Sequence, residues 1–132
     1  MTTRTVEAEW RGGYQVEVVT EGRFRLLVDE PESAGGTDTG AQPTDYLLAA
    51  IASCFALALV HSARKRGQEP GSVRVSVTGT YEGPRYRDIA IDIVSSLSDE
   101  QAHLLIEAAQ RVCYVTNTLR EPPRITIGHT RG

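Results

Sequence analysis

Residues 46–60 read YLLAAIASCFALALV, a run of apolar and small residues broken by a single serine. Pro43 and Thr44 precede the run and favour a helix start, because proline fits the first turn and threonine caps it. Gly67 follows three basic residues, an order typical of a helix end. The sequence therefore predicts a helix of roughly 22 residues, about 33 Å long at 1.5 Å per residue.

This helix is apolar on almost every side, which one small sheet of a 132-residue chain cannot cover. Its small side chains allow another helix to approach closely: Ala49, Ala50, Ala52, Ser53, Ala56 and Ala58. The apolar run is shorter than the roughly 20 residues that span a bilayer. We therefore expect a buried helix at the centre of an obligate homodimer rather than a membrane span.

The residues before the helix predict an antiparallel β-meander. Three β-rich runs are expected as strands, residues 5–10, 14–20 and 23–29. The pairs Gly12-Gly13 and Glu21-Gly22 separate these runs and are hairpin signals. Residues 30–40 are polar and glycine-rich without phosphate-loop spacing, so we expect a plain connecting loop.

The residues after the helix predict a second β-hairpin and a second helix. Hydrophobic alternation indicates strands at 73–81 and 87–96, with a turn at Glu82-Gly83-Pro84. Ser98 and Gln101 fit a capping box that opens the second helix, and residues 124–128 are expected to form a last strand. The order indicates one α+β domain over residues 1–132.

Composition narrows the classes of partner. The chain has 14 basic and 17 acidic residues, and no basic cluster larger than residues 64–66. Nucleic acid and membranes are therefore not expected partners. The N-terminus shows no apolar signal core, so we expect a cytoplasmic protein, in which a disulfide is transient and catalytic.

Cys54 and Cys113 are the only cysteines. From the residue type alone, a packed core thiol is the ordinary reading for each. His61 lies seven residues from Cys54, about 10 Å along a helix, which is too far for shared metal coordination. His103 and His129 form no ligand spacing with either cysteine, so no metal site is expected.

The segment QPTDYLLAAIASCF at residues 42–55 resembles the first-cysteine segment of the OsmC/Ohr family of thiol peroxidases, and CYVTNTL at residues 113–119 resembles its second-cysteine segment. The two segments occur in the family's order, 59 positions apart from cysteine to cysteine. The resemblance implies an α+β fold with a β-meander, a long central helix, a hairpin, a Cys-bearing helix and a C-terminal strand. It also implies an intertwined homodimer.

The resemblance also implies a reaction. Cys54 would attack an organic hydroperoxide and become a sulfenic acid, Cys113 would condense with it to a disulfide, and an external dithiol would reset the pair. No metal, flavin or nucleotide cofactor is implied.

Two positions depart from the family's pattern. Thr44 stands where the family has a glutamate that holds an arginine against the reactive sulfur, and Asp45 stands next to it. In a regular helix Asp45 lies about 180° around from Cys54 and Thr44 about 80°. For Asp45, an interaction with the helix dipole is therefore as good an explanation as a role in orienting the arginine. The candidate arginines are Arg11, Arg23 and Arg25, and Tyr14 stands where peroxidase members can carry arginine.

Cys113 is expected to end the second helix, before a short turn at residues 115–119, and so to be less enclosed than Cys54. Tyr114 replaces a residue that is often proline in the family, and Asn117 and Thr118 are expected in capping and turn roles. One alternative is an OsmC-like binding or redox-sensing module with weak or no turnover, which Thr44 favours. Another is that both cysteines are inert fillers.

Overall fold

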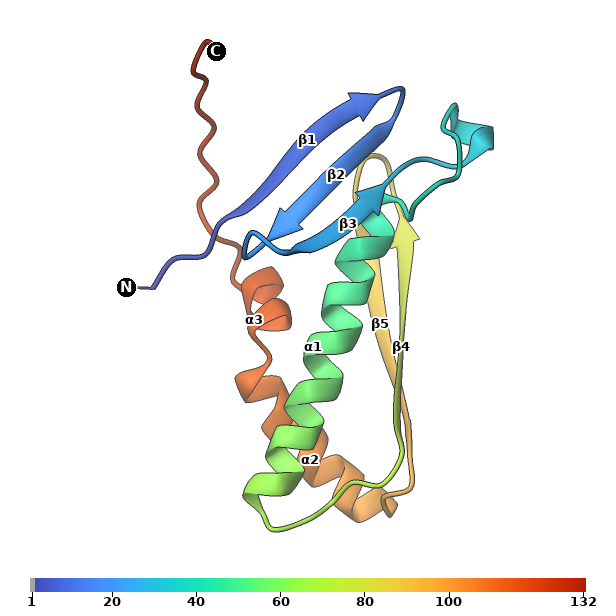
Figure 1. The fold of residues 1–132 in the computed structure, drawn as a ribbon. Helices are drawn as coiled ribbons and strands as arrows, with labels where there is room; N and C mark the ends of the chain where they lie inside the picture. Colours follow the sequence, from blue (N-terminus) through green and yellow to red (C-terminus); the bar gives the residue numbers. More distant parts are fainter. Residues whose placement is uncertain (1) are drawn as a thin grey trace. The chain divides into compact units, whose positions relative to one another are not determined.

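The computed structural model describes residues 2–132 and has the predicted α+β architecture (Figure 1). The chain divides into two compact units, Met1–Leu47 and Leu48–Gly132. The first unit holds strands β1 (Val6–Gly12), β2 (Gln15–Thr20) and β3 (Phe24–Val28), which form an antiparallel sheet in the order β1-β2-β3. The predicted meander is confirmed.

The turn between β2 and β3 explains the Glu21-Gly22 signal. Both residues have positive φ, 54° and 67°, and the Arg23 N–H donates to the Thr20 carbonyl at 3.1 Å. This is the backbone of a type I′ turn, whose twist matches that of the flanking strands. The glycine takes the left-handed conformation without steric cost, so it favours the hairpin.

A buried carboxylate organises the connecting loop after β3. The Asp29 side chain is fully buried and accepts hydrogen bonds from the hydroxyls of Thr37 and Thr39, each at 2.6 Å, and from the Glu30 N–H at 2.7 Å. The Thr37 and Thr39 hydroxyls hold the pKa of Asp29 well below its usual range, although burial acts in the opposite direction. The loop, which includes the short 3-10 helix η1 (Glu32–Ala34), is therefore more ordered than its composition indicates.

Helix α1 (Pro43–Lys65) begins and ends where the sequence predicts. Gly67 has φ 72°, its N–H donates to the Arg64 carbonyl at 2.9 Å, and the Gln68 N–H donates to the Ala63 carbonyl at 2.9 Å. These bonds satisfy carbonyls left open at the helix end. At 23 residues α1 passes the length and composition test for a membrane span, a test that the core helix of a soluble protein also passes.

The second unit packs α1 against a helix and a hairpin. Strands β4 (Val73–Tyr81) and β5 (Tyr86–Ser95) are antiparallel, with Val77 opposite Ile91. Ser98 and Gln101 form the predicted capping box at the start of α2 (Asp99–Val112). The core joins Phe55 and Leu59 of α1 to Leu105 and Ala109 of α2, and inward side chains of both strands pack on it: Val73, Val75, Ile91 and Ile93.

Two expectations for the C-terminal part are wrong. Residues 115–119 belong to a helix, α3 (Tyr114–Arg120), and not to a turn. Residues 124–128 form no strand within the part of the chain that the structure describes, and Ile125 and Ile127 are exposed. Alternation marks a segment that suits a sheet edge, but this segment pairs with no strand of its own chain.

Candidate functional site

The fold brings the two cysteine side chains together. Cys54 lies in the middle of α1, and Cys113 lies between α2 and α3. Both thiols are free, Cys54 packs against the core cluster that contains Cys113, and the Cys54 side chain is one of the groups that lower the pKa of Cys113. Two residues 59 positions apart in sequence are thus brought to the same core cluster.

Cys113 occupies a break in the helical backbone. Its φ and ψ of −78° and 102° are extended, so it ends α2 and is also the N-cap residue of α3. Its side chain is 0% exposed, whereas Cys54 is half-buried. The expectation that Cys113 is the less enclosed cysteine is wrong, because Cys113 lies in the core with Leu105 and Ala109 rather than on a surface turn.

Opposing effects act on the pKa of Cys113. Burial, the largest of them, raises it, while hydrogen bonds from the Thr116 hydroxyl, the Thr116 and Val115 N–H groups and Cys54 lower it. The donors prevail, and the pKa of Cys113 lies below its ordinary value. Thr116 is itself buried, and its hydroxyl donates a hydrogen bond to the Cys113 carbonyl at 3.3 Å, beside the sulfur. The surroundings of the enclosed cysteine therefore stabilise its thiolate more than water does.

Cys54 opens onto an apolar groove of about 360 Å³. The groove is lined by Cys54, Leu57, Ala58, His61, Val112 and Tyr114. Leu57 is 69% exposed and Tyr114 is 83% exposed, which is unusual for side chains of this size. Among the described residues that line the groove, none is an arginine, a lysine or a carboxylate. Cys54 is thus accessible to a small apolar molecule.

The candidate arginines all lie in the first unit and have carboxylate partners there. Arg11 and Arg25 both reach Glu17, at 3.0 and 2.7 Å. Arg23 lies 3.5 Å from Glu21, and its guanidinium stacks over the Phe24 ring at 4.3 Å. These ion pairs give each arginine an ordinary surface role in the sheet.

Thr44 and Asp45 lie in the first turn of α1, which is helical from Pro43 onward. Helical geometry then keeps the Asp45 side chain about 180° around the helix from Cys54. Asp45 is the acidic residue of the first turn, where a carboxylate interacts favourably with the helix dipole.

Several neighbours of the cysteines were not singled out from the sequence. Thr116 follows Cys113 by three positions, the spacing at which an N-cap side chain meets the N3 residue, and this spacing was the available signal.

The local roles expected of Asn117 and Thr118 are confirmed: Asn117 Nδ2 donates to the Arg111 carbonyl at 3.3 Å, and Thr118 Oγ1 donates to the Tyr114 carbonyl at 2.7 Å. Within residues 2–132, no group of three His, Cys, Asp or Glu side chains is placed to hold a metal.

Comparisons with known proteins identify the family and the fold. The OsmC-like protein family matches residues 36–128 of the chain. No curated protein matches it. An OsmC-like protein from Mycoplasma pneumoniae shares the fold at 18% identity, with a TM-score of 0.78 and 92% of this chain and 89% of that chain covered.

Two further solved structures are similar and carry more specific names. An organic hydroperoxide resistance protein OsmC from Legionella pneumophila is 23% identical, with a TM-score of 0.68 and 91% of this chain and 90% of that chain covered. The organic hydroperoxide resistance protein OhrB of Bacillus subtilis is 27% identical, with a TM-score of 0.60 and 89% of this chain and 90% of that chain covered.

Proposed function

Since the chain belongs to the OsmC-like protein family, we propose that it is a thiol-dependent peroxidase that reduces organic hydroperoxides in defence against oxidative stress. One observation carries the proposal: two free thiols are in contact, and one of them opens onto an apolar groove while the other is enclosed. We assign the attack on peroxide to Cys54 and the resolving step to Cys113. Similarity to hydroperoxide resistance proteins supports this assignment.

The first step is attack of Cys54 on the peroxide. The hydrogen bond between the cysteines and the lowered pKa of Cys113 support a pair that carries one proton and one negative charge between two sulfurs. The proton moves from Cys54 to Cys113 as the Cys54 sulfur attacks the terminal peroxide oxygen. The O–O bond breaks, Cys54 becomes a sulfenic acid, and the leaving alkoxide takes the proton back from Cys113 to form the alcohol.

The second step closes the disulfide. The Cys113 thiolate attacks the Cys54 sulfenic sulfur, and hydroxide leaves and is protonated by solvent to water. An external dithiol then reduces the disulfide by exchange and is oxidised to its own disulfide. Each turnover thus consumes one hydroperoxide and one dithiol and yields one alcohol and one water.

The departure at Thr44 fits this scheme. No arginine lines the Cys54 groove among its described residues, so the charge that activates Cys54 comes from Cys113 in the same unit.

We propose that the protein works as a cytoplasmic homodimer of one functional domain. The strands of the first unit leave Trp10, Phe24 and Leu26 exposed, α1 leaves Leu57 exposed, and Ile125 follows without a strand partner. Monomeric proteins seldom expose so much large apolar surface. Sedimentation at micromolar concentration is expected to show a dimer, and a stable folded monomer of 14.4 kDa contradicts the proposal.

A second candidate function is redox sensing or binding without turnover. Thr44 in place of the family's glutamate favours it. Such a module oxidises once and is not recycled by dithiol, whereas inert cysteines show no loss of free thiols with peroxide. Alkylation of Cys54 followed by mass spectrometry across pH separates inert cysteines from a reactive pair, because a reactive Cys54 must act as a thiolate, and recycling by dithiol then separates a peroxidase from a sensor.

Steady-state turnover tests the peroxidase directly. With dithiothreitol as reductant, we expect tert-butyl hydroperoxide to be consumed at least about tenfold faster than hydrogen peroxide, because the apolar groove binds the alkyl group. Consumption of both peroxides at the rate of a protein-free control rules out the enzyme and leaves the sensing alternative.

A further inference from the structure

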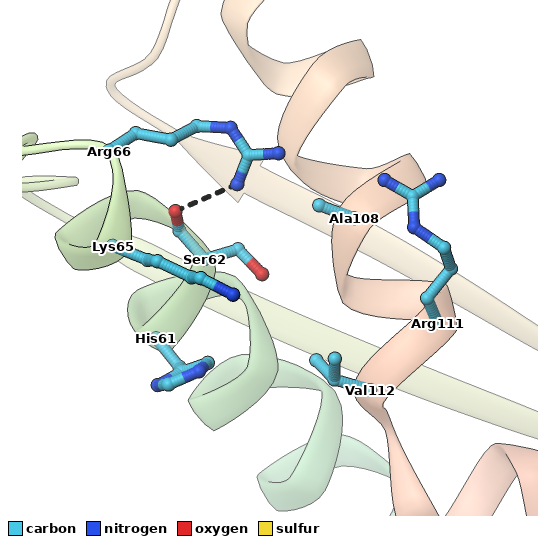
Figure 2. A pocket seen from close by; sticks show the side chains of 7 residues that line it. All are labelled: His61, Ser62, Lys65, Arg66, Ala108, Arg111 and Val112. Atoms are coloured by element: carbon cyan, nitrogen blue, oxygen red, sulfur yellow. Dashed lines mark hydrogen bonds between the residues drawn. The ribbon is translucent and has the colours of Figure 1, made fainter.

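A second groove, of about 350 Å³, lies between the last turns of α1 and α2 (Figure 2). Its walls come from both helices and from the residue after α1: His61, Ser62, Lys65, Arg66, Ala108, Arg111 and Val112. Figure 2 shows the guanidinium groups of Arg66 and Arg111 extending from opposite walls, with the Lys65 side chain beside them. No described lining residue is acidic.

The cations of this groove are poorly neutralised. Neighbouring Arg64 pairs with Glu69 at 3.0 Å, but Lys65 and Arg66 have no carboxylate within ion-pair distance in the described part of the chain. Arg66 donates to the Ser62 carbonyl at 3.1 Å, a bond that holds its guanidinium at the groove. Arg111 has one exposed carboxylate neighbour, Glu107, at 3.7 Å, too far for a strong hydrogen bond.

The helix dipoles explain only part of this charge. Basic residues at helix C-termini offset a partial charge of about −0.5 at each end, so the two helices account for about one positive charge of the three. A surplus of about +1 remains at the groove when the Glu107 carboxylate beside Arg111 is also counted. The chain as a whole has a net charge of −3, so the surplus is a local feature and not a consequence of a basic protein.

We propose that this groove binds a small phosphate monoester. A phosphoryl dianion complements the three cations of the groove, and its three terminal oxygens can accept from a lysine and two arginines that approach from different directions. Ala108 and Val112 provide an apolar wall beside the cations, and the groove is larger than a bare phosphate ion needs. The groove adjoins the Cys54 groove, with which it shares His61 and Val112, but binding there does not require that the chain be a peroxidase.

Calorimetry on the reduced full-length protein at low salt tests the site, with glycerol 3-phosphate as the probe. We expect saturable binding that weakens with salt, tighter than that of inorganic phosphate or succinate, and no binding of glycerol. Lys65→Gln and Arg111→Gln should each weaken binding at least about tenfold, because each variant loses one hydrogen bond to a charged group. Arg74→Gln removes the same charge from an exposed site on β4 and should leave the affinity unchanged.

Absence of saturable binding, or equal weakening by Arg74→Gln, overturns the site as a specific one. Inorganic phosphate or succinate binding as tightly as the ester overturns the choice of a phosphate monoester. Since the substituted residues are exposed, the variants should remain folded, and the Ala108 methyl signal in NMR spectra provides a second readout, because Ala108 lines this groove and not the Cys54 groove.

Discussion

Cys54 and Cys113 touch each other, yet their surroundings differ in almost every respect. Cys54 lies on a continuous helix, is half-buried and borders an apolar groove without a charged donor. Cys113 lies at a break between two helices and is fully buried, and the Thr116 hydroxyl and nearby backbone N–H groups lower its pKa. Cys54 is accessible from the groove, whereas the surroundings of Cys113 stabilise negative charge on its sulfur. Contact between them lets the pair combine the two properties.

The largest effect on peroxide consumption is expected when the accessible thiol is removed. Cys54→Ser should lower alkyl hydroperoxide consumption to the uncatalysed rate, a loss of at least about a hundredfold, because buried Cys113 cannot reach the peroxide. A coupled assay that follows peroxide loss measures this. A variant that retains the parent rate would mean that the buried cysteine, or neither cysteine, reacts.

Removal of the enclosed thiol should have a different outcome. Cys113→Ser should consume about one equivalent of peroxide per chain, more slowly than the parent, and then stop, because the disulfide cannot form. Mass spectrometry should find Cys54 as sulfenic acid that proceeds to sulfinic acid. Continued turnover with dithiol would show that Cys113 is not the resolving residue.

Thr116 tests whether the donors around Cys113 matter for the rate. Thr116→Val removes the hydroxyl and should raise the pKa of Cys113, and a rise of about one unit lowers the thiolate fraction about tenfold at pH values below that pKa. Because the parent's pKa is lowered, its disulfide formation should increase with pH and level off below the ordinary range of cysteine. The Thr116→Val profile should level off at higher pH with the same maximum.

Thr116→Ser is the matched control, since it keeps the hydroxyl and should restore the parent pH profile. A fall in the maximum rate with no movement of the profile would indicate that Thr116 acts only through packing.

The smallest effect is expected at Thr44. Thr44→Glu restores the family's carboxylate at the start of α1 and should speed peroxide attack about twofold to threefold by orienting an arginine toward the pair. Thr44→Gln has the same length without charge and should not. Equal rates of peroxide attack in the two variants would show that a carboxylate at position 44 has no effect on the reaction. That result would not change the roles assigned to Cys54 and Cys113.

Local patterns were sufficient for most of the fold. Pro43 and Gly67 bounded the long helix, Glu21-Gly22 placed a hairpin, and Ser98 with Gln101 opened α2, because each is a short-range signal. The alternation around Ile125 was misread as a strand of this chain, since a pattern shows that a segment suits a sheet but not which edge it joins.

The site was less predictable than the fold. The sequence and its family resemblance singled out the two cysteines but reversed their burial, which depends on how α2 and α3 pack around Cys113. The apolar groove joins Leu57 to Val112 and Tyr114 from a distant part of the chain, so no local pattern could indicate it. Asp29 likewise gave no sign that it is buried and held by Thr37 and Thr39.

The central claim is that Cys54 and Cys113 of one chain form a redox pair. Peptide mapping by mass spectrometry after treatment with one equivalent of tert-butyl hydroperoxide tests it most directly. The account predicts an intramolecular Cys54–Cys113 disulfide as the main product, fully reversed by dithiothreitol. Links only between chains, or over-oxidised Cys54 beside a free Cys113 thiol, would contradict it.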